Sequence, residues 1–144
     1  MRWPWSKSSY LEGSIEISSD ELRSILNQFN PLRLSFVDTK YLLLDYEKIK
    51  DMFFDFHSAF NIIGHPEFPD CDDFAFICWA DILRGAIKDG FRLSPAGGLI
   101  TLTRISGKRH QLNFAVTNQR SLRFYEPQTG KWEEPDGYVF EFEG

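Results

Sequence analysis

Residues 70–90, DCDDFAFICWADILRGAIKDG, decide the fold. Apolar residues recur in this stretch at helical spacing, Asp70 is placed to cap its start, and Gly90 is placed to end it. The apolar positions are Phe74, Ile77, Cys78, Ile82, Leu83 and Ile87. The pattern predicts one long helix in which Cys71 is the first helical residue.

Two shorter helices are predicted upstream. Ser18 stands three residues before Glu21, the spacing of a capping box, and the apolar stripe that follows stops before Pro31. Asp45 can cap a second helix that ends near His57, which we assign a structural role. The stripes are Leu22, Ile25, Leu26 and Phe29 in the first helix, and Ile49, Met52, Phe53 and Phe56 in the second. A short strand is expected at residues 32–37.

Beyond residues 95–98 (PAGG) apolar and polar residues alternate. The alternation covers residues 99–104, 111–117, 122–125 and 138–142, and turn residues separate these segments. These alternating segments, separated by turns, predict an antiparallel meander. Because helices come first and strands second, we expect the α+β class rather than alternating α/β.

The length and composition suit one globular unit. A chain of 144 residues can bury a single core, and 14 Phe and 4 Trp predict that aromatic packing dominates it. We expect residues 1–17 to form an N-terminal arm and residues 18–144 to form a single domain.

Charge and hydropathy argue against several classes of partner. The net charge is -5 and the basic residues are scattered, so nucleic acid is not expected. No stretch reaches the roughly 18 apolar residues of a membrane span, and residues 1–9 lack the apolar core of a signal peptide. We therefore expect a cytoplasmic protein that binds no membrane.

The cysteine count fits the same compartment. Cys71 and Cys78 lie seven residues apart on the predicted helix, about 10 Å along its axis, which is too far for a disulfide. Both cysteines are therefore expected to be free thiols, as is usual in a reducing compartment. The spacing of His and Cys does not indicate zinc, and nothing indicates an organic cofactor.

Three residues could form a catalytic group. Cys71 at a helix start faces backbone N–H groups and the positive end of the helix dipole, both of which favour the thiolate. His110 opens one predicted strand and Glu126 ends the next, so pairing of these strands would place a base beside an orienting carboxylate. Cys78, in mid-helix on the apolar stripe, is assigned to the core. His65, in the loop before Cys71, is an outside candidate for the base.

These residues also carry a resemblance. The run DCDDFA at 70–75, the strand opening with His110 and the run YEPQTG at 125–130 resemble the C-terminal domain of the Marasmius oreades agglutinin and its bacterial and phage-type relatives, which are papain-like cysteine proteases. The similarity covers roughly residues 69–130. It implies a papain-like fold with Cys71 as nucleophile, His110 as base and Glu126 as the orienting residue. In the agglutinin a sugar-binding β-trefoil precedes this domain, so the family's glycan targeting and dimerisation are not carried over to this chain by the resemblance.

Two functions remain open on these grounds. The first is a cysteine peptidase, or a related acyl-transfer hydrolase, that acts on a protein or peptide substrate. The alternative is a catalytically inactive papain-like module that binds or inhibits a protein partner, through its cleft or through Trp3 and Trp5.

Acidic residues surround the proposed thiol at Asp70, Asp72 and Asp73. Nearby negative charge raises the pKa of a thiol, so the arrangement requires an explanation. Carboxylates in a first helical turn can simply complement the dipole. They can also bind calcium, and the resemblance implies a calcium-activated enzyme. Both explanations stay open.

Overall fold

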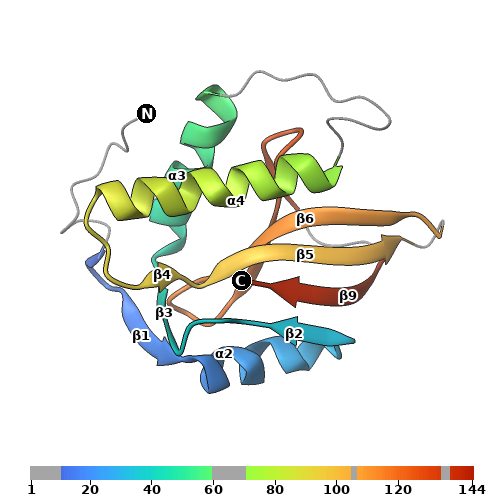
Figure 1. Cartoon of the computed structure of the whole chain (residues 1–144), viewed down its shortest axis with the longest axis horizontal. Helices are drawn as coiled ribbons and strands as arrows, with labels where there is room; N and C mark the ends of the chain where they lie inside the picture. Colours follow the sequence, from blue (N-terminus) through green and yellow to red (C-terminus); the bar gives the residue numbers. More distant parts are fainter. Residues whose placement is uncertain (1–10, 60–70, 105–106, 134–136) are drawn as a thin grey trace.

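The computed structural model describes residues 11–59, 71–104, 107–133 and 137–144, without the side chains of 55–59, 104 and 137–140 (Figure 1). In chain order the elements are β1 (Ile15–Ser18), α2 (Ser19–Leu26), the 3-10 turn η1 (Asn27–Phe29), β2 (Arg33–Ser35), β3 (Lys40–Leu43), α3 (Tyr46–Ala59), α4 (Cys71–Lys88), β4 (Ser94–Pro95), β5 (Gly97–Arg104), β6 (Arg109–Val116), β7 (Leu122–Glu126), β8 (Lys131–Glu133) and β9 (Gly137–Glu143). Of the helices described, none combines the length and the apolarity that crossing a bilayer requires. The α+β class is confirmed.

The strands form one large and one small sheet. The large sheet has the order β2-β9-β5-β6-β7-β8, in which only the β2–β9 pair is parallel, and the small sheet has the order β1-β3-β4. The meander predicted from the sequence is therefore correct for β5 to β7 only. The last strand, β9, pairs with β5, and the unpredicted strand β8 occupies the edge beside β7. Alternation of apolar and polar residues identifies a strand but does not show which strand pairs with it. This is why the predicted strand order is wrong beyond β7.

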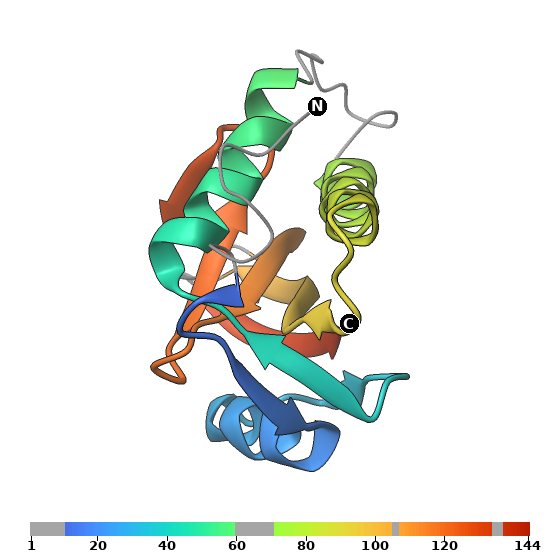
Figure 2. The same cartoon turned by 90° about the vertical axis from the view of Figure 1, so that its left-hand side faces the viewer.

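The large sheet lies between two apolar cores. On one face it packs against α2, β1 and β3, and on the other it packs against α3 and α4. Alternation along β6 serves both cores, because Phe114 and Val116 enter the first while Ala115 enters the second. Figure 2 shows the result, with α2 at the far end of the molecule from α3 and α4.

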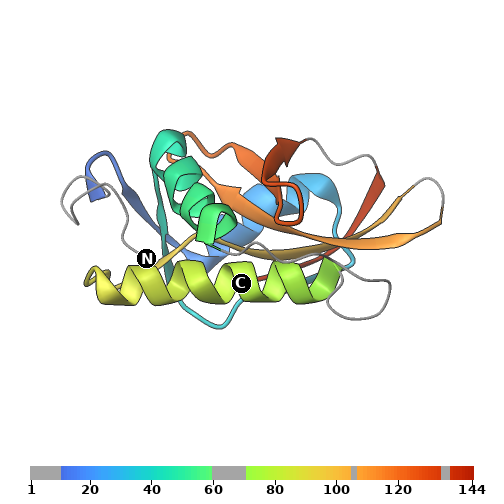
Figure 3. The same cartoon turned by 90° about the horizontal axis from the view of Figure 1, so that it is seen from above.

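Helix α4 forms as the sequence predicted. It begins at Cys71, and Gly90 follows its last turn with a φ of 80°, the left-handed conformation of a helix C-terminus. Cys78 is fully buried, as expected, whereas Ile87 is 74% exposed and does not belong to the apolar stripe. The smaller Ala86 occupies the buried position of that turn. Figure 3 shows α4 extended along the side of the molecule, so its first turn reaches one end of the sheet.

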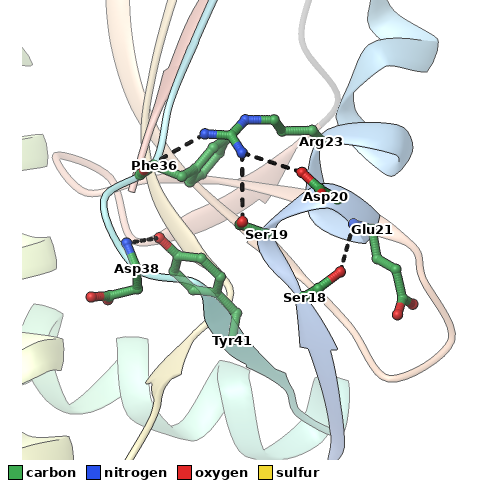
Figure 4. Close-up of polar contacts among 8 residues, drawn as sticks. All are labelled: Ser18, Ser19, Asp20, Glu21, Arg23, Phe36, Asp38 and Tyr41. Carbon is green, nitrogen blue, oxygen red and sulfur yellow. Dashed lines mark hydrogen bonds and ion pairs between the residues drawn. The ribbon is translucent and has the colours of Figure 1, made fainter.

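Side chains cap the two shorter helices as predicted. At α2 the Ser18 hydroxyl accepts a hydrogen bond from the Glu21 N–H at 3.1 Å (Figure 4). Arg23 of the same helix then reaches the Phe36 carbonyl at 3.5 Å, which ties α2 to the segment after β2. At α3 the Asp45 carboxylate accepts from the Glu47 N–H at 2.8 Å.

The N-terminal segment takes part in the fold from residue 15 onward. Residues 15–17, which we assigned to the arm, form most of β1, and Ile17 is 2% exposed in the first core. Trp3 and Trp5 lie outside the described residues.

Candidate functional site

The candidate site begins with Cys71 at the head of α4. The residue is half-buried, and as the first residue of an 18-residue helix it lies beside backbone N–H groups that have no partner within the helix. These groups and the helix dipole favour negative charge on its sulfur. Asp70 and His65, also named from the sequence, lie outside the described residues.

His110 and Glu126 are in direct contact. His110 is the second residue of β6, Glu126 is the last residue of β7, and Nε2 of the imidazole lies 2.5 Å from Oε2 of the carboxylate. The side chains are only 15% and 7% exposed. At this distance and burial the carboxylate fixes the orientation of the ring, and the contact becomes an ion pair when the imidazole is protonated.

A tight turn holds the Glu126 carboxylate in place. Its second oxygen, Oε1, accepts a hydrogen bond from the Gln128 N–H at 3.0 Å. The backbone carbonyl of Glu126 accepts from the Gly130 N–H at 2.8 Å, and Gly130 has a φ of 74°. Both carboxylate oxygens therefore have a partner, one in the backbone and one in His110, so the pair is rigid.

Cys71 and His110 line the same open pocket of about 380 Å³. The other lining residues are Asp72, Thr101, Arg109 and Gln111. Part of the wall is fixed, because the Gln111 side-chain amide donates to the Thr101 hydroxyl at 2.9 Å. The volume suits a small ligand. The structure thus brings Cys71 and His110 to one pocket, with Glu126 joined to His110.

Asn113 supports the site and was missed by the sequence reasoning. It is fully buried, and its side-chain amide donates to the Ala75 carbonyl of α4 at 2.9 Å and to the Gly98 carbonyl of β5 at 3.3 Å. These bonds tie the beginning of α4, and with it Cys71, to the sheet. Its signal in the sequence is an amide within the otherwise apolar run LNFAV.

Only two of the three proposed calcium ligands, Asp72 and Asp73, lie among the described residues. Asp72 and Asp73 lie in the first turn of α4, and Asp72 lines the pocket. Within the described part of the chain, no three His, Cys, Asp or Glu side chains come together in a way that could hold a metal ion. Calcium therefore stays a prediction from the sequence, and the dipole explanation for these acids stays beside it.

The two thiols occupy different environments. Burial, and secondarily the charge of Asp81, raises the pKa of the Cys78 thiol well above its ordinary value. We therefore expect Cys78 to be unreactive, and its complete burial agrees with its assignment to the core. Both cysteines lie among the described residues, and no disulfide joins them.

Comparison with known proteins gives a match in fold only. No family model matches the sequence, and no curated protein matches it. Among solved structures, PSL1a in its complex with E64 matches with a TM-score of 0.75 and 20% identity over 88% of this chain and 50% of that one. Polyporus squamosus lectin, bound to the human-type influenza-binding epitope Neu5Acα2-6Galβ1-4GlcNAc, matches with a TM-score of 0.72, 20% identity, and 88% and 49% coverage. The chain spans about half the length of each.

These matches correct the expected activity. The sequence predicted a cysteine peptidase or related hydrolase acting on a protein, but one of these neighbours is named as a lectin and neither name describes a hydrolase. The assignments as an enzyme, a hydrolase and a thiol protease are therefore withdrawn. The resemblance holds at a coarser level, since the fold is similar to that of a fungal lectin while no protease family is shown.

Proposed function

We propose that this chain is a ligand-binding module whose ligand lies in the pocket beside Cys71. The observation that carries the proposal is the 2.5 Å contact between His110 and Glu126 in a site that His110 shares with Cys71. Removing an imidazole and a carboxylate from water is costly, so a fixed pair of this kind beside a thiol is a common feature of functional sites.

The chemistry of the pocket favours a ligand that forms a covalent bond to the sulfur of Cys71. An imidazole oriented by Glu126 can accept the proton of the Cys71 thiol, and the helix N–H groups stabilise the thiolate that results. A thiolate opens an epoxide by forming one S–C bond and breaking one C–O bond, and the new alkoxide takes its proton from the His110 imidazolium. E64, the compound bound to one solved neighbour, carries such an epoxide. The product is one stable adduct per chain, without turnover.

Intact-mass measurement with E64 tests this proposal. We expect a single adduct, which peptide mapping places on Cys71 and which Cys71→Ser abolishes. His110→Asn should slow the reaction by about tenfold or more, equivalent to about 1.4 kcal/mol of activation free energy, because the proton acceptor is lost. An adduct rate on Cys71 no faster than that of free cysteine would contradict the proposal.

Glycan recognition at the same pocket is a second candidate. Apart from Cys71, the lining side chains all carry groups that can donate or accept a hydrogen bond, and the Arg109 guanidinium is suited to a sugar carboxylate. The comparison with solved structures supports this candidate, because the lectin neighbour is bound to a sialylated epitope. This chain spans 49% of that lectin.

A calorimetric titration with that sialylated trisaccharide, and with the disaccharide that lacks sialic acid, tests this candidate. We expect only the trisaccharide to bind, and Arg109→Gln to weaken it. Prior reaction of Cys71 with E64 should block binding if both ligands use this pocket. Equal behaviour of the two sugars would contradict a role for Arg109, and no binding of either would remove the candidate.

A further inference from the structure

A second pocket, of about 140 Å³, lies between the start of α3 and the β7–β8 hairpin. It is lined by Tyr46, Arg123, Phe124, Trp132 and Glu133. None of these residues lines the pocket beside Cys71. An apolar cavity of about 150 Å³ can hold benzene, so this pocket has room for a ligand of about one ring.

Arg123 brings an unpaired guanidinium to this pocket. Its Cζ atom lies 4.5 Å from the centre of the Tyr46 ring, a cation–π contact that holds the guanidinium in place. Within the described part of the chain Arg123 has no ion-pair partner, and its Nε is a buried donor without a hydrogen bond. Buried donors without a partner are costly and uncommon. The guanidinium is therefore available to an acceptor supplied by a ligand.

The charge of Arg123 is not cancelled by the other residues of the lining. Glu133 pairs across the hairpin with Phe124, which is buried in the core on the opposite face of the sheet. Because cross-strand partners point to the same face, the Glu133 side chain points away from Arg123. In the adjacent turn of α3, Lys50 and Glu47 form an ion pair at 2.8 Å and neutralise each other. The pocket therefore presents one positive charge.

The aromatic wall of the pocket has a fixed position. Trp132 packs edge-on against Tyr46, with ring centroids 5.5 Å apart, and against Phe53 of α3 at 5.1 Å. It also packs against Tyr125 at 5.0 Å, and the Tyr125 hydroxyl donates to the Phe53 carbonyl at 3.3 Å. These contacts fix the indole relative to α3, so an apolar group can pack on it beside the guanidinium.

We propose that this pocket binds a small organic monocarboxylate whose apolar body is about one ring in size. A guanidinium binds a carboxylate through two parallel N–H···O bonds, and the aromatic wall contacts the apolar body. A phosphate group is disfavoured, because phosphate sites of this kind use clusters of arginines and this lining has one. A cation would be repelled by Arg123, and a neutral ligand would leave the guanidinium without a counter-ion.

An NMR titration of the isotope-labelled protein with phenylacetate, and with its uncharged analogue phenylacetamide, tests the proposal. We expect phenylacetate to bind at roughly millimolar affinity and to shift the signal of the Trp132 indole N–H. Phenylacetamide lacks the charge and acetate lacks the ring, so each should bind more weakly by about tenfold or more. This comparison uses only the wild-type protein, so it does not depend on the folding of any variant.

Substitutions of Arg123 test the same point from the side of the protein. Arg123→Gln should remove the preference for phenylacetate over phenylacetamide, and Arg123→Lys should keep only part of it, because an ammonium lacks the planar fork. Arg120→Gln is the matched control. Arg120 precedes the same strand, forms a surface ion pair with Glu21 and does not line the pocket, so its loss removes the same charge elsewhere.

The control variant should bind phenylacetate like the wild type. Cys71→Ser should do so as well, which separates this site from the proposed function. The proposal is overturned if the wild type binds phenylacetate no better than phenylacetamide, or if phenylphosphonate binds more tightly than phenylacetate. It is also overturned if folded Arg123→Gln and Arg120→Gln bind phenylacetate alike.

Discussion

Cys71 and Cys78 lie on one helix but in different surroundings, so we expect their thiols to differ in reactivity. Cys71 faces a pocket with His110, whereas burial raises the pKa of Cys78 far above its ordinary value. We expect iodoacetamide at pH 6 to modify Cys71 and leave Cys78 untouched until the protein unfolds. Peptide mapping after timed alkylation measures this. Comparable rates at the two positions would show that Cys71 receives no activation from its surroundings.

Glu126 is expected to act on that reaction through His110. Glu126→Gln keeps the shape of the side chain and the acceptor for the Gln128 N–H, but it removes the charge that stabilises an imidazolium. The alkylation rate of Cys71 should therefore fall by about tenfold, or about 1.4 kcal/mol of activation free energy. Timed alkylation of the two proteins, followed by peptide mapping, measures this ratio. Equal rates in the variant and the wild type would mean that Glu126 has only a packing role.

Asp81 gives a prediction on stability. It is 5% exposed on α4 with an unpartnered Oδ2, and burial raises its pKa while Arg84 and Lys88 oppose that effect. A raised pKa in the folded state means a stabilisation that is present below the unfolded pKa of about 3.9 and lost as pH rises through the folded pKa. Asp81→Asn should therefore raise the melting temperature at pH 7 and change it less at pH 4. Asp89→Asn is the control, and an equal gain at both pH values would contradict the assignment.

The residues of the candidate site differ in how well the sequence located them. Cys71 could be placed because a helix start has local signals, and His110 and Glu126 because strand ends do. Asn113 and Trp132 could not, since each depends on contacts with elements far along the chain. Local pattern identifies a residue's element, while its partners come from tertiary packing.

At the scale of elements, β5 begins with two glycines, Gly97 and Gly98, that let it approach its neighbours closely. A Cβ on Gly98, which has a φ of 151°, would lie 1.8 Å from the Glu143 carbonyl oxygen of β9. Gly98→Ala should therefore cost about 3 kcal/mol or more in the free energy of unfolding, measured by urea denaturation. Gly107→Ala is the control, because its φ of 88° gives strain without any atom within 4 Å. Equal losses would mean that backbone strain alone matters.

The helices followed the sequence more closely than the sheet did. Caps at Ser18 and Asp45 and the glycine after α4 are local signals, and each marks an observed boundary. Strand order is set by which faces must be buried together. Phe142 of β9 is fully buried in the core that holds Ile100 and Phe114, so β9 joins β5 instead of continuing the meander.

At the scale of the whole molecule, the candidate site lies where three elements meet. The start of α4 and the start of β6 reach one pocket, and the end of β7 joins them through the contact between His110 and Glu126. The cores lie on either face of the sheet, and the residues that line the pocket belong to neither of them. The separation of the site from the cores is consistent with a fold that this chain shares with a solved structure of only 20% sequence identity. The fold class could therefore be predicted from pattern, whereas the type of function could not.

Calcium remains a prediction for the whole molecule, because its proposed ligands extend from α4 into residues outside the described part. Asp72 and Asp73 crowd the first turn, and a dication would offset their mutual repulsion. A cation that binds only the folded chain stabilises it by about 2.7 kcal/mol at one hundred times its dissociation constant. We therefore expect the melting temperature to rise with calcium and fall with chelator.

The variant Asp73→Asn separates the two explanations for these acids. If they bind calcium, the variant should respond less to the ion, whereas Asp89→Asn near the other end of α4 should respond like the wild type. If they only complement the dipole, Asp73→Asn should lower stability by about 0.3–1 kcal/mol with or without calcium. Scanning calorimetry of the three proteins in calcium and in chelator measures both quantities. Melting of the wild type that is the same in calcium and in chelator would leave the dipole as the whole reason for the acidic helix start.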